Sequence, residues 1–593
     1  MKKLLFFISR GIGFTTPIYY KTKMSASSST DALRFHLAYK PEPLKFGTSG
    51  RRGLVIHLTQ LEIYTNVLAE IHYLQSLQRS EGGIQAGDDF YYAHDLRPSS
   101  TNYVENGRGG LCQAVEQALK DGGMRPLNLG AIPTPALTYY ALKKSKGSIM
   151  VTGSHIPFDR NGYKLNTSVG ELLKKDEQPI NDAVELNREK LLAQPYAESL
   201  FDSQGSFREA QSSLLPVIAE GKTAYIQRYL DFFNGETLQG MKLLAYQHSA
   251  VGRDLLVELF EKLGAKVTAA GRSETFVPID TEAIDQVQLN TLQALYNETG
   301  QTFDAIISTD GDSDRPLLLA PEGDRLRFFG GDLLGMIVGG FLGADAVVVP
   351  ISTNDAIDRG TLADVTEPKT KIGSPYVIAG MQRAVSKGHH RVCGWEANGG
   401  FLTGSDIERN GNVLTALPTR DAILPLLCAL FAAHSRQITL PELFSTLPHR
   451  FSRAALIRNF PRPTSMKIIE RFSPPEAMMQ EIWYHPDHII VHDSNRATLD
   501  VTDGHAKQLD KIRRELQTVF SPTFGFAPIT RLNYTDGVRI IFANDDVAHF
   551  RPSGNADELR IYAVADTQER ADTIASQGVM EPDGLLRHLE RMV

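Results

Sequence analysis

The segment 303–315 reads Phe-Asp-Ala-Ile-Ile-Ser-Thr-Asp-Gly-Asp-Ser-Asp-Arg. Its first half, Phe303–Ser308, has the apolar character of a short buried strand, and a polar turn follows with carboxylates at Asp310, Asp312 and Asp314. Ligand sites of α/β proteins form at the carboxyl ends of strands, so this turn is a candidate ligand site. Alternating carboxylates in an irregular loop can converge on one hard cation, and the alternative is a solvated acidic turn.

The acidic turn does not fit an EF-hand. A loop of that type starting at Asp310 needs glycine at 315 and glutamate at 321, and the chain has Arg315 and Pro321 instead. Three carboxylates leave open positions on an octahedral ion, which is typical of Mg²⁺ completed by water and phosphate. The turn therefore predicts a magnesium site.

Apolar strands alternate with helical patterns through most of the chain, which predicts an α/β fold. Helices are expected at Gly109–Asp121 and Gly252–Leu263, and the apolar segments Gly331–Leu342 and Ala422–Ala433 are short enough to be buried helices. Strands are expected, in chain order, at Phe90–Ala93, Ser148–Val151, Met241–Tyr246, Ala265–Thr268, Phe303–Ser308, Ala346–Ile351 and His390–Cys393.

Two segments look like linkers and divide the chain. Residues 178–221 are polar, and residues 453–475 carry four prolines. Beyond them, Val538–Ala543 and Leu559–Val564 look like two strands joined by a Gly/Ser loop, which predicts a last domain of the α+β class. The expected blocks are a disordered tail at 1–30, α/β domains at 31–200, 201–320 and 321–455, and an α+β domain at 456–593.

Composition excludes several classes of protein. A chain of 593 residues suggests about four domains. Its 62 basic and 69 acidic residues give a net charge of −7, which excludes a broadly basic nucleic-acid-binding protein but not a local basic pocket, so no nucleic-acid partner is expected. No stretch reaches the roughly 20 apolar residues that span a bilayer, so no membrane partner is expected. Three distant cysteines suit a reducing, cytoplasmic location.

The first 30 residues are the segment expected to be a disordered tail. They hold five basic residues, no acidic one and the short apolar run Leu4–Ile8. A disordered tail, an upstream start with Met24 as alternative first residue, and a cleaved targeting segment all remain open.

A serine beside a histidine, Ser154-His155, follows the expected strand Ser148–Val151. A nucleophile elbow needs G-x-S-x-G and a helix directly after it, and here Ile156 and Pro157 make a turn instead. On this segment alone, Ser154 is an ordinary loop serine.

Two further turns carry groups that could bind a phosphorylated sugar. Segment 394–401 places Glu396 and Asn398 beside paired glycines and could hydrogen-bond sugar hydroxyls; the alternative is a plain tight turn. Segment 551–555 begins with Arg551, a bidentate phosphate donor, and its glycine permits an anion-binding nest; the alternative is a hairpin loop.

Together and in this order, the four turns resemble those of the α-D-phosphohexomutase superfamily, which includes phosphomannomutases and phosphoglucomutases. The resemblance runs from about Phe46 to Ala565. It implies three related α/β domains and a C-terminal α+β domain around a central cleft. Further matching segments are 46–53, 95–99, 133–136 and 371–373.

The resemblance also implies roles for individual residues. Ser154 would carry the transferable phosphate and join Asp310, Asp312 and Asp314 as a Mg²⁺ ligand. Lys164 and Arg52 would serve in proton transfer and charge stabilisation, and His155 and Arg315 complete the catalytic group. Sugar and phosphate contacts fall on Lys371, Gly373, Glu396, Asn398, Arg551, Ser553, Gly554 and Asn555.

The implied reaction interconverts a hexose 1-phosphate and a hexose 6-phosphate through phosphoserine and a hexose 1,6-bisphosphate. The partners would be mannose or glucose phosphates, and the protein a monomer or dimer. The chain departs from the family pattern at Ile156, Asn398 and 555–557, and the last two departures leave the subfamily and the sugar preference open. The alternatives are phosphoglucosamine mutase activity, a metal-dependent sugar-phosphate phosphatase, and a silent relative that only binds sugar phosphate.

Overall fold

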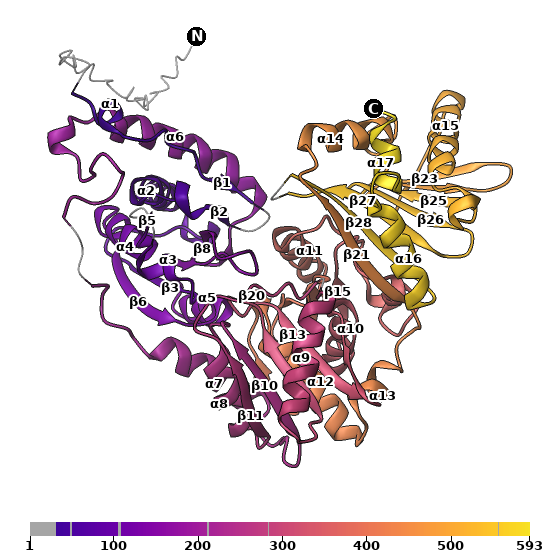
Figure 1. Ribbon diagram of the computed structural model, residues 1–593, viewed down its shortest axis with the longest axis horizontal. Helices are drawn as coiled ribbons and strands as arrows, with labels where there is room; N and C mark the ends of the chain where they lie inside the picture. The colour runs from indigo at the N-terminus through magenta and orange to yellow at the C-terminus, as the bar shows by residue number, and fades with distance from the viewer. Residues whose placement is uncertain (1–30, 48–49, 105–107, 210–212, 283, 555–556) are drawn as a thin grey trace, which may run out of the picture.

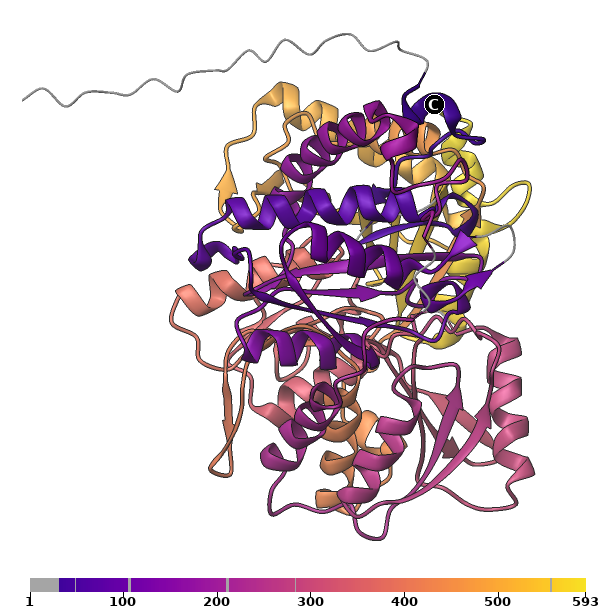
Figure 2. The same cartoon turned by 90° about the vertical axis from the view of Figure 1, so that its left-hand side faces the viewer.

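The computed structural model describes residues 31–47, 50–104, 108–209, 213–282, 284–554 and 557–593. Four large β-sheets follow one another along the chain, with seven, five, four and eight strands. In Figure 1 the first sheet lies at the left, the second and third lie below, and the eight-stranded sheet lies at the upper right. Figure 2 again places the purple N-terminal part above the magenta middle of the chain.

The first sheet has the order β1-β2-β8-β7-β3-β6, with β9 paired to β8. Its strands are β1 Lys45–Phe46, β2 Arg51–Leu54, β3 Asp89–His94, β6 Arg125–Ala131, β7 Ser148–Val151, β8 Arg160–Thr167 and β9 Gly170–Glu171; β4 Tyr103–Val104 and β5 Arg108–Gly109 form a separate ribbon. Its helices are α1 Leu33–His36, α2 Gln60–Ser76, α3 Pro98–Thr101, α4 Leu111–Asp121, α5 Thr134–Lys143 and α6 Glu177–Ala193.

Helices cover both faces of the first sheet. Phe90 and Tyr92 of β3 point to the core that contains the apolar side chains of α2 and α4. Tyr91 and Ala93 alternate to the other face, where α5 packs. Because both faces are buried, β7 is apolar or small at every position, as expected for a strand inside a layered α/β unit.

The second sheet has the order β11-β10-β12-β13-β14, and the third β15-β16-β17-β20. The second unit contains α7 Glu220–Phe232, β10 Lys242–His248, α8 Arg253–Lys262, β11 Lys266–Arg272, α9 Gln286–Glu298, β12 Ala305–Thr309, β13 Pro316–Glu322 and β14 Arg325–Phe328. The third contains α10 Gly331–Leu342, β15 Ala346–Val348, α11 Ser374–Ser386, β16 Val392–Trp395, β17 Phe401–Thr403, β18 Ile407–Arg409, β19 Asn412–Leu414, β20 Leu417–Asp421, α12 Ile423–Arg436 and α13 Leu440–Phe444.

The first three sheets repeat one topological step. In each, a strand paired in parallel to its neighbour continues into an antiparallel partner: β7 into β8, β12 into β13, and β16 into β17. The serine, acidic and sugar turns are the connections at these three equivalent places. The predicted set of three related α/β units is therefore confirmed.

The eight-stranded sheet is antiparallel throughout, in the order β21-β28-β27-β26-β25-β22-β23-β24. Its elements are β21 Phe451–Arg458, α14 Arg462–Arg471, β22 Glu481–Tyr484, β23 Ile489–His492, β24 Thr498–Leu499, α15 Asp503–Val519, β25 Ile529–Asn533, β26 Val538–Phe542, β27 Val547–Pro552, β28 Glu558–Ala565, α16 Gln568–Val579 and α17 Leu585–Glu590. Its helices pack on one face around a separate core. The α+β class predicted for this part is confirmed.

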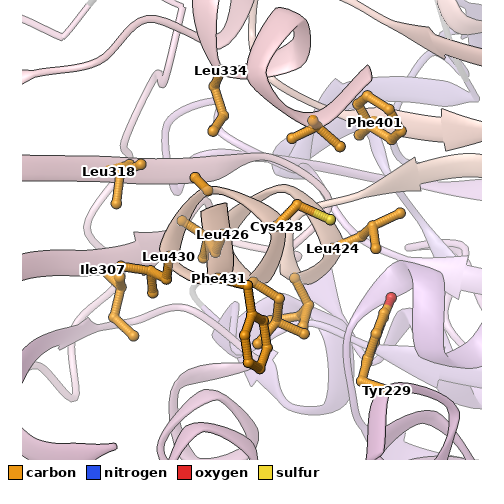
Figure 3. Close-up of a cluster of buried hydrophobic side chains, with 14 of the residues drawn as sticks. Tyr229, Ile307, Leu318, Leu334, Phe401, Leu424, Leu426, Cys428, Leu430 and Phe431 are labelled. Atoms are coloured by element: carbon orange, nitrogen blue, oxygen red, sulfur yellow. The ribbon is translucent and has the colours of Figure 1, made fainter. Parts of the chain in front are cut away.

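One hydrophobic core is shared by the first three units. Helix α12 lies at its centre and is buried along nearly all its length, because its sequence is apolar on every side. Figure 3 shows Cys428, Leu430 and Phe431 of this helix among side chains of the second unit, from β12 (Ile307) and from α7 (Tyr229).

The structure corrects three expectations about local structure. Residues 178–221 are not all linker, since α6 occupies the first part, and 453–475 hold most of β21 and all of α14. Between the two expected late strands lies a third, β27. Sheet two continues to Phe328, beyond the expected break at 320, and the break at 455 falls inside β21. Across the described ranges, no helix is both long and apolar enough to cross a membrane.

Candidate active site

The serine turn places Ser154 at the buried junction of the first and second units. Its backbone is left-handed, with φ 56°, which is uncommon outside glycine and marks a strained, well-supported position. The turn is held by Arg97, whose Nη2 donates to the Ser154 carbonyl at 3.0 Å and also to Ile156. Ser154 Oγ is thereby aimed out of its own turn and donates to Asp310 Oδ2 at 3.0 Å.

The three carboxylates of the acidic turn converge. One oxygen from each of Asp310, Asp312 and Asp314 lies within 4.8 Å of the others, and all three residues are buried. Lys164, on β8 of the first unit, donates from Nζ to Asp312 Oδ2 and to Asp314 Oδ2, each at 2.6 Å. The Thr134 hydroxyl donates to the same Asp312 oxygen at 2.5 Å. Residues of two units therefore build one charged centre.

The pKa values of Asp310 and Asp314 are shifted in opposite directions. Burial, with repulsion from Asp312 and Asp314, raises the pKa of Asp310 to about 8. Burial acts the same way on Asp314, but Arg420, Lys164 and Arg315 outweigh it and hold its pKa below the ordinary value. The trio thus concentrates negative charge that the neighbouring basic side chains compensate only in part.

The donor set fits a divalent cation. Asp312 Oδ1 and Asp314 Oδ1 are buried and have no hydrogen-bond partner among the described residues. A buried carboxylate oxygen without a partner is costly unless a cation meets it. Three carboxylates and a nearby hydroxyl are the hard oxygen ligands that such an ion prefers.

The remaining predicted catalytic residues surround this centre. Burial lowers the pKa of Arg52 to about 10, with Asp312 opposing and Arg420 and Arg315 adding to the shift. His155 Nδ1 is 3.4 Å from Ser154 Oγ, and burial first, then Arg315, hold the pKa of His155 well below its ordinary value. Arg315 Nε is 3.7 Å from Asp314 Oδ1. All of them lie in the neighbourhood of the trio.

The sugar turn is tied to the acidic turn by Arg420 on β20. Its guanidinium donates to Asp314 Oδ2 from Nε at 3.1 Å and reaches Glu396 Oε2 from Nη1 at 3.1 Å. Asn398 shapes the turn, because its Oδ1 accepts from Gly400 N and its carbonyl accepts from the Thr281 hydroxyl. The Glu396 and Asn398 positions are therefore fixed relative to the cation site.

The phosphate turn lies at the end of β27. Arg551 Nε is 3.4 Å from Asp536 Oδ1, and Asp536 Oδ2 accepts a hydrogen bond from Ile372 N at 3.0 Å. Asp536 thus joins Arg551 to the 371–373 loop, where Lys371 is exposed and Gly373 has φ 130° before α11. Ser553 and Gly554 follow Arg551, while Asn555 lies outside the described residues.

Three supporting residues have no assigned role in the sequence predictions, although one of them, Arg97, lies in the matching segment 95–99. Arg97 holds the serine turn, Arg420 joins the acidic and sugar turns, and Arg462 donates to the Ser553 carbonyl at 3.0 Å. Each acts on a turn 57 to 106 residues away in the chain. A local motif carries no signal of such a distant partner.

This combination defines a class of protein. A buried serine hydroxyl rests on an acidic trio fitted to a divalent cation, with a lysine and arginines around it. Phosphoryl transfer needs such positive charge around a phosphate group and a positioned nucleophile. The fold and the site therefore define a phosphoryl-transfer protein built from three repeated α/β units and one α+β unit.

Comparison with known proteins gives the family. Residues 43–190 match the phosphoglucomutase/phosphomannomutase alpha/beta/alpha domain I model, and residues 331–451 match the domain III model. A phosphomannomutase of Salmonella muenchen is 37% identical over 532 residues, covering 90% of this chain and 94% of that protein. A phosphomannomutase of Sinorhizobium fredii is 35% identical over 535 residues, covering 90% and 98%.

A solved structure shows the same fold. The crystal structure of a putative phosphomannomutase from Thermus thermophilus superposes with a TM-score of 0.60 at 17% identity, covering 90% of this chain and 98% of that one. The chain belongs to the phosphoglucomutase/phosphomannomutase family. The family and the mixed α/β fold predicted from the sequence are confirmed, and the enzyme class is that of a phosphohexomutase.

Proposed function

We propose that this protein is a phosphomannomutase that interconverts mannose 1-phosphate and mannose 6-phosphate through a phosphate carried on Ser154. The observation that carries the proposal is the 3.0 Å contact between Ser154 Oγ and Asp310 Oδ2. Two buried oxygens of the same trio have no hydrogen-bond partner among the described residues. A serine that merely lined a loop would not be expected to lie buried against a carboxylate of an acidic trio. Phosphomannomutases are also the relatives that match most of the chain.

We propose Mg²⁺ as the resident ion, held by Asp310, Asp312, Asp314 and the oxygen on Ser154. When bound, the ion would polarise the phosphoryl group and offset its charge. Lys164 adds positive charge between Asp312 and Asp314 and is placed to exchange a proton with the sugar hydroxyl. Arg52 and Arg315 add further positive charge around the same oxygens.

The remaining groups hold the sugar phosphate in two orientations. Glu396 and Asn398 would contact the sugar hydroxyls, and Arg551 with Ser553 and Gly554 would hold the phosphate that is not reacting. A bisphosphate formed at Ser154 would then turn and return its other phosphate to the serine. Lys371 and Gly373 lie on the loop that Asp536 joins to Arg551, so sugar and phosphate contacts would form together.

The test is a pair of serine variants. The wild type should carry one covalent phosphate, located by mass spectrometry on Ser154, and should convert mannose 1-phosphate in a coupled assay. Ser154→Ala should lose both. Ser168→Ala, another buried serine of the first unit, should lose neither. An active Ser154→Ala protein would remove Ser154 from the mechanism.

The same assay separates the other candidates. Glucose 1-phosphate and glucosamine 1-phosphate measured beside mannose 1-phosphate give the sugar preference; phosphoglucosamine mutases are among the more distant relatives. Phosphate release without isomer formation would indicate a phosphatase. We also propose a cytoplasmic location, since the three cysteines are free and buried.

A further inference from the structure

A cavity lies between the third unit and the C-terminal sheet. Its volume is about 600 Å³, within the range of small-molecule sites. One wall is the segment after β15, with Asp355, Asp358 and Lys369, and the other is the sheet face carrying Trp483, Arg531 and Arg539. None of the residues assigned to the active site lines it.

The two walls differ in how their charges are compensated. On the first wall, Asp355 pairs with Arg450 at 2.6 Å and Asp358 pairs with Lys369 at 2.6 Å. On the sheet wall, Arg531 and Arg539 have no carboxylate within ion-pair distance among the residues described. Asp355 and Asp358 of the first wall act on Arg539 from beyond ion-pair distance and offset part of its charge. Among the described residues, the sheet wall therefore holds two guanidinium groups outside direct ion pairs, whose remaining charge an anion would offset.

Neighbouring groups hold the side chains of both arginines in position. Arg539 is 5% exposed, and its Nη1 donates to the Ile351 carbonyl at 2.6 Å, which spans the two walls. The guanidinium of Arg531 lies 4.4 Å from the ring centroid of Trp483. Both arginines are thus held in place before any ligand arrives, which lowers the entropic cost of binding.

Hydroxyl-binding groups lie beside the arginines. Glu481 and Asn533 are directly opposite each other on β22 and β25 and both line the cavity. Trp483 Nε1 is buried and has no hydrogen-bond partner among described residues. Carboxylate and amide groups next to an aromatic ring and guanidinium groups match a molecule with a phosphoryl head and a hydroxyl-rich body.

We propose that this cavity is a second ligand site for a phosphorylated sugar, distinct from the active site. Arg531 and Arg539 bind the phosphoryl group, and Glu481 and Asn533 bind hydroxyls. Two sources share this chemistry: a free hexose monophosphate and a nucleoside diphosphate hexose. The proposal goes beyond the mutase reaction and does not require turnover.

The site is mechanically connected to the phosphate turn. Arg531 lies on β25 and Arg539 on β26, which are adjacent strands of one hairpin. The turn of that hairpin carries Asp536, which contacts Arg551 and the Ile372 amide. A ligand that holds the hairpin against the third unit therefore also holds Arg551, so occupancy should change the KM for the hexose phosphate.

Tryptophan fluorescence gives a direct test, because the chain has two tryptophans. Mannose 6-phosphate and UDP-glucose are titrated separately into the intact wild-type protein. Trp483 beside the phosphoryl site should report binding, and Trp483→Phe should remove that signal while keeping any signal from Trp395 near the sugar turn. Dialysis with radiolabelled probes counts the molecules bound per chain.

Arginine variants show which of the bound molecules occupy the proposed site. In Arg531→Gln the second-site Kd should rise about tenfold, as expected for one charged hydrogen bond. If UDP-glucose is the ligand, turnover measured without it should stay unchanged; if the hexose phosphate is the ligand, its KM should shift. Arg496→Gln, an exposed lining residue, weakens the same site and covers the case in which Arg531→Gln does not fold. Arg551→Gln should weaken only the active site.

The outcomes identify which of the two ligands binds, and they include a result that would refute the proposal. Two hexose phosphates per wild-type chain that fall to one in Arg531→Gln, or one UDP-glucose lost in Arg531→Gln, would support it and identify the source. Single occupancy by mannose 6-phosphate, together with no UDP-glucose binding or binding unaffected by Arg531 and Arg496, would overturn it. Because binding is read without catalysis, a failed mutase assay leaves this result interpretable.

Discussion

Replacing Arg420 with methionine should destabilise the protein and increase its dependence on a divalent cation. Methionine keeps much of the length of the side chain and removes its charge. Arg420 is 3% exposed and pairs with Asp314 and Glu396, which are equally buried. The variant therefore leaves two buried carboxylates without one of their partners.

The expected size follows from the local charges. Removing one partner of a buried ion pair costs about 3–5 kcal/mol. Lys164 still donates to Asp314 at 2.6 Å, so the lower end, about 3 kcal/mol, is the expected loss of unfolding free energy in the absence of Mg²⁺. The centre also becomes more negative by one unit, so Mg²⁺ should bind the folded variant more tightly. At a hundredfold excess over Kd, Mg²⁺ would return about 2.7 kcal/mol.

Urea unfolding with EDTA and with Mg²⁺ measures both effects. Arg420→Lys should fall between wild type and Arg420→Met, because it keeps the charge and loses the forked geometry. Arg272→Met removes a 2.6 Å pair with Asp254 at the surface and should change stability much less. An Arg420→Met protein as stable as wild type in EDTA, with the same response to Mg²⁺, would refute the reasoning.

Two further predictions concern the third unit. Burial raises the pKa of Asp332 from 3.8 to about 7, so its protonation stabilises the fold at low pH and that stabilisation is lost as pH rises through 7. Asp332→Asn should gain up to about 4 kcal/mol relative to wild type between pH 4 and pH 8 in urea unfolding, and a pH-independent difference would contradict this. Gly331→Ala should lower activity, because its Cβ would lie 2.1 Å from Gly399 N in the sugar turn. The matched Gly340→Ala, on the open side of the same helix, should stabilise α10 by roughly 0.5–1 kcal/mol and leave kcat/KM unchanged.

The chemistry-bearing turns could be predicted because each is a local motif. The acidic trio is three alternating residues, and Ser154 follows a short apolar strand, so composition and spacing identify both. Their partners could not be predicted this way. Arg97 and Arg420 reach these turns only after distant strands come together, and an isolated arginine in the chain looks the same whether it is buried or exposed.

The errors in the fold have equally specific causes. Helix α6 buries Ile180, Val184, Arg188 and Leu191, and one of these four is an arginine held by Glu62, so its apolar stripe is too weak to stand out. In α14 the prolines mark a beginning, since Pro461 is the N-cap and Pro463 lies in the first turn. Prolines clustered at a helix start resemble a linker when the sequence is considered alone.

The shared core around α12 sets how this molecule can be taken apart. Side chains from the first three units interlock in it, whereas the part after Arg450 folds around its own interior. A chimera that exchanges only the C-terminal part with that of a relative would keep both interiors whole. Cuts made earlier in the chain would divide the shared core and expose apolar side chains on each fragment. The boundary near Arg450 is therefore the suitable place to exchange parts of this enzyme.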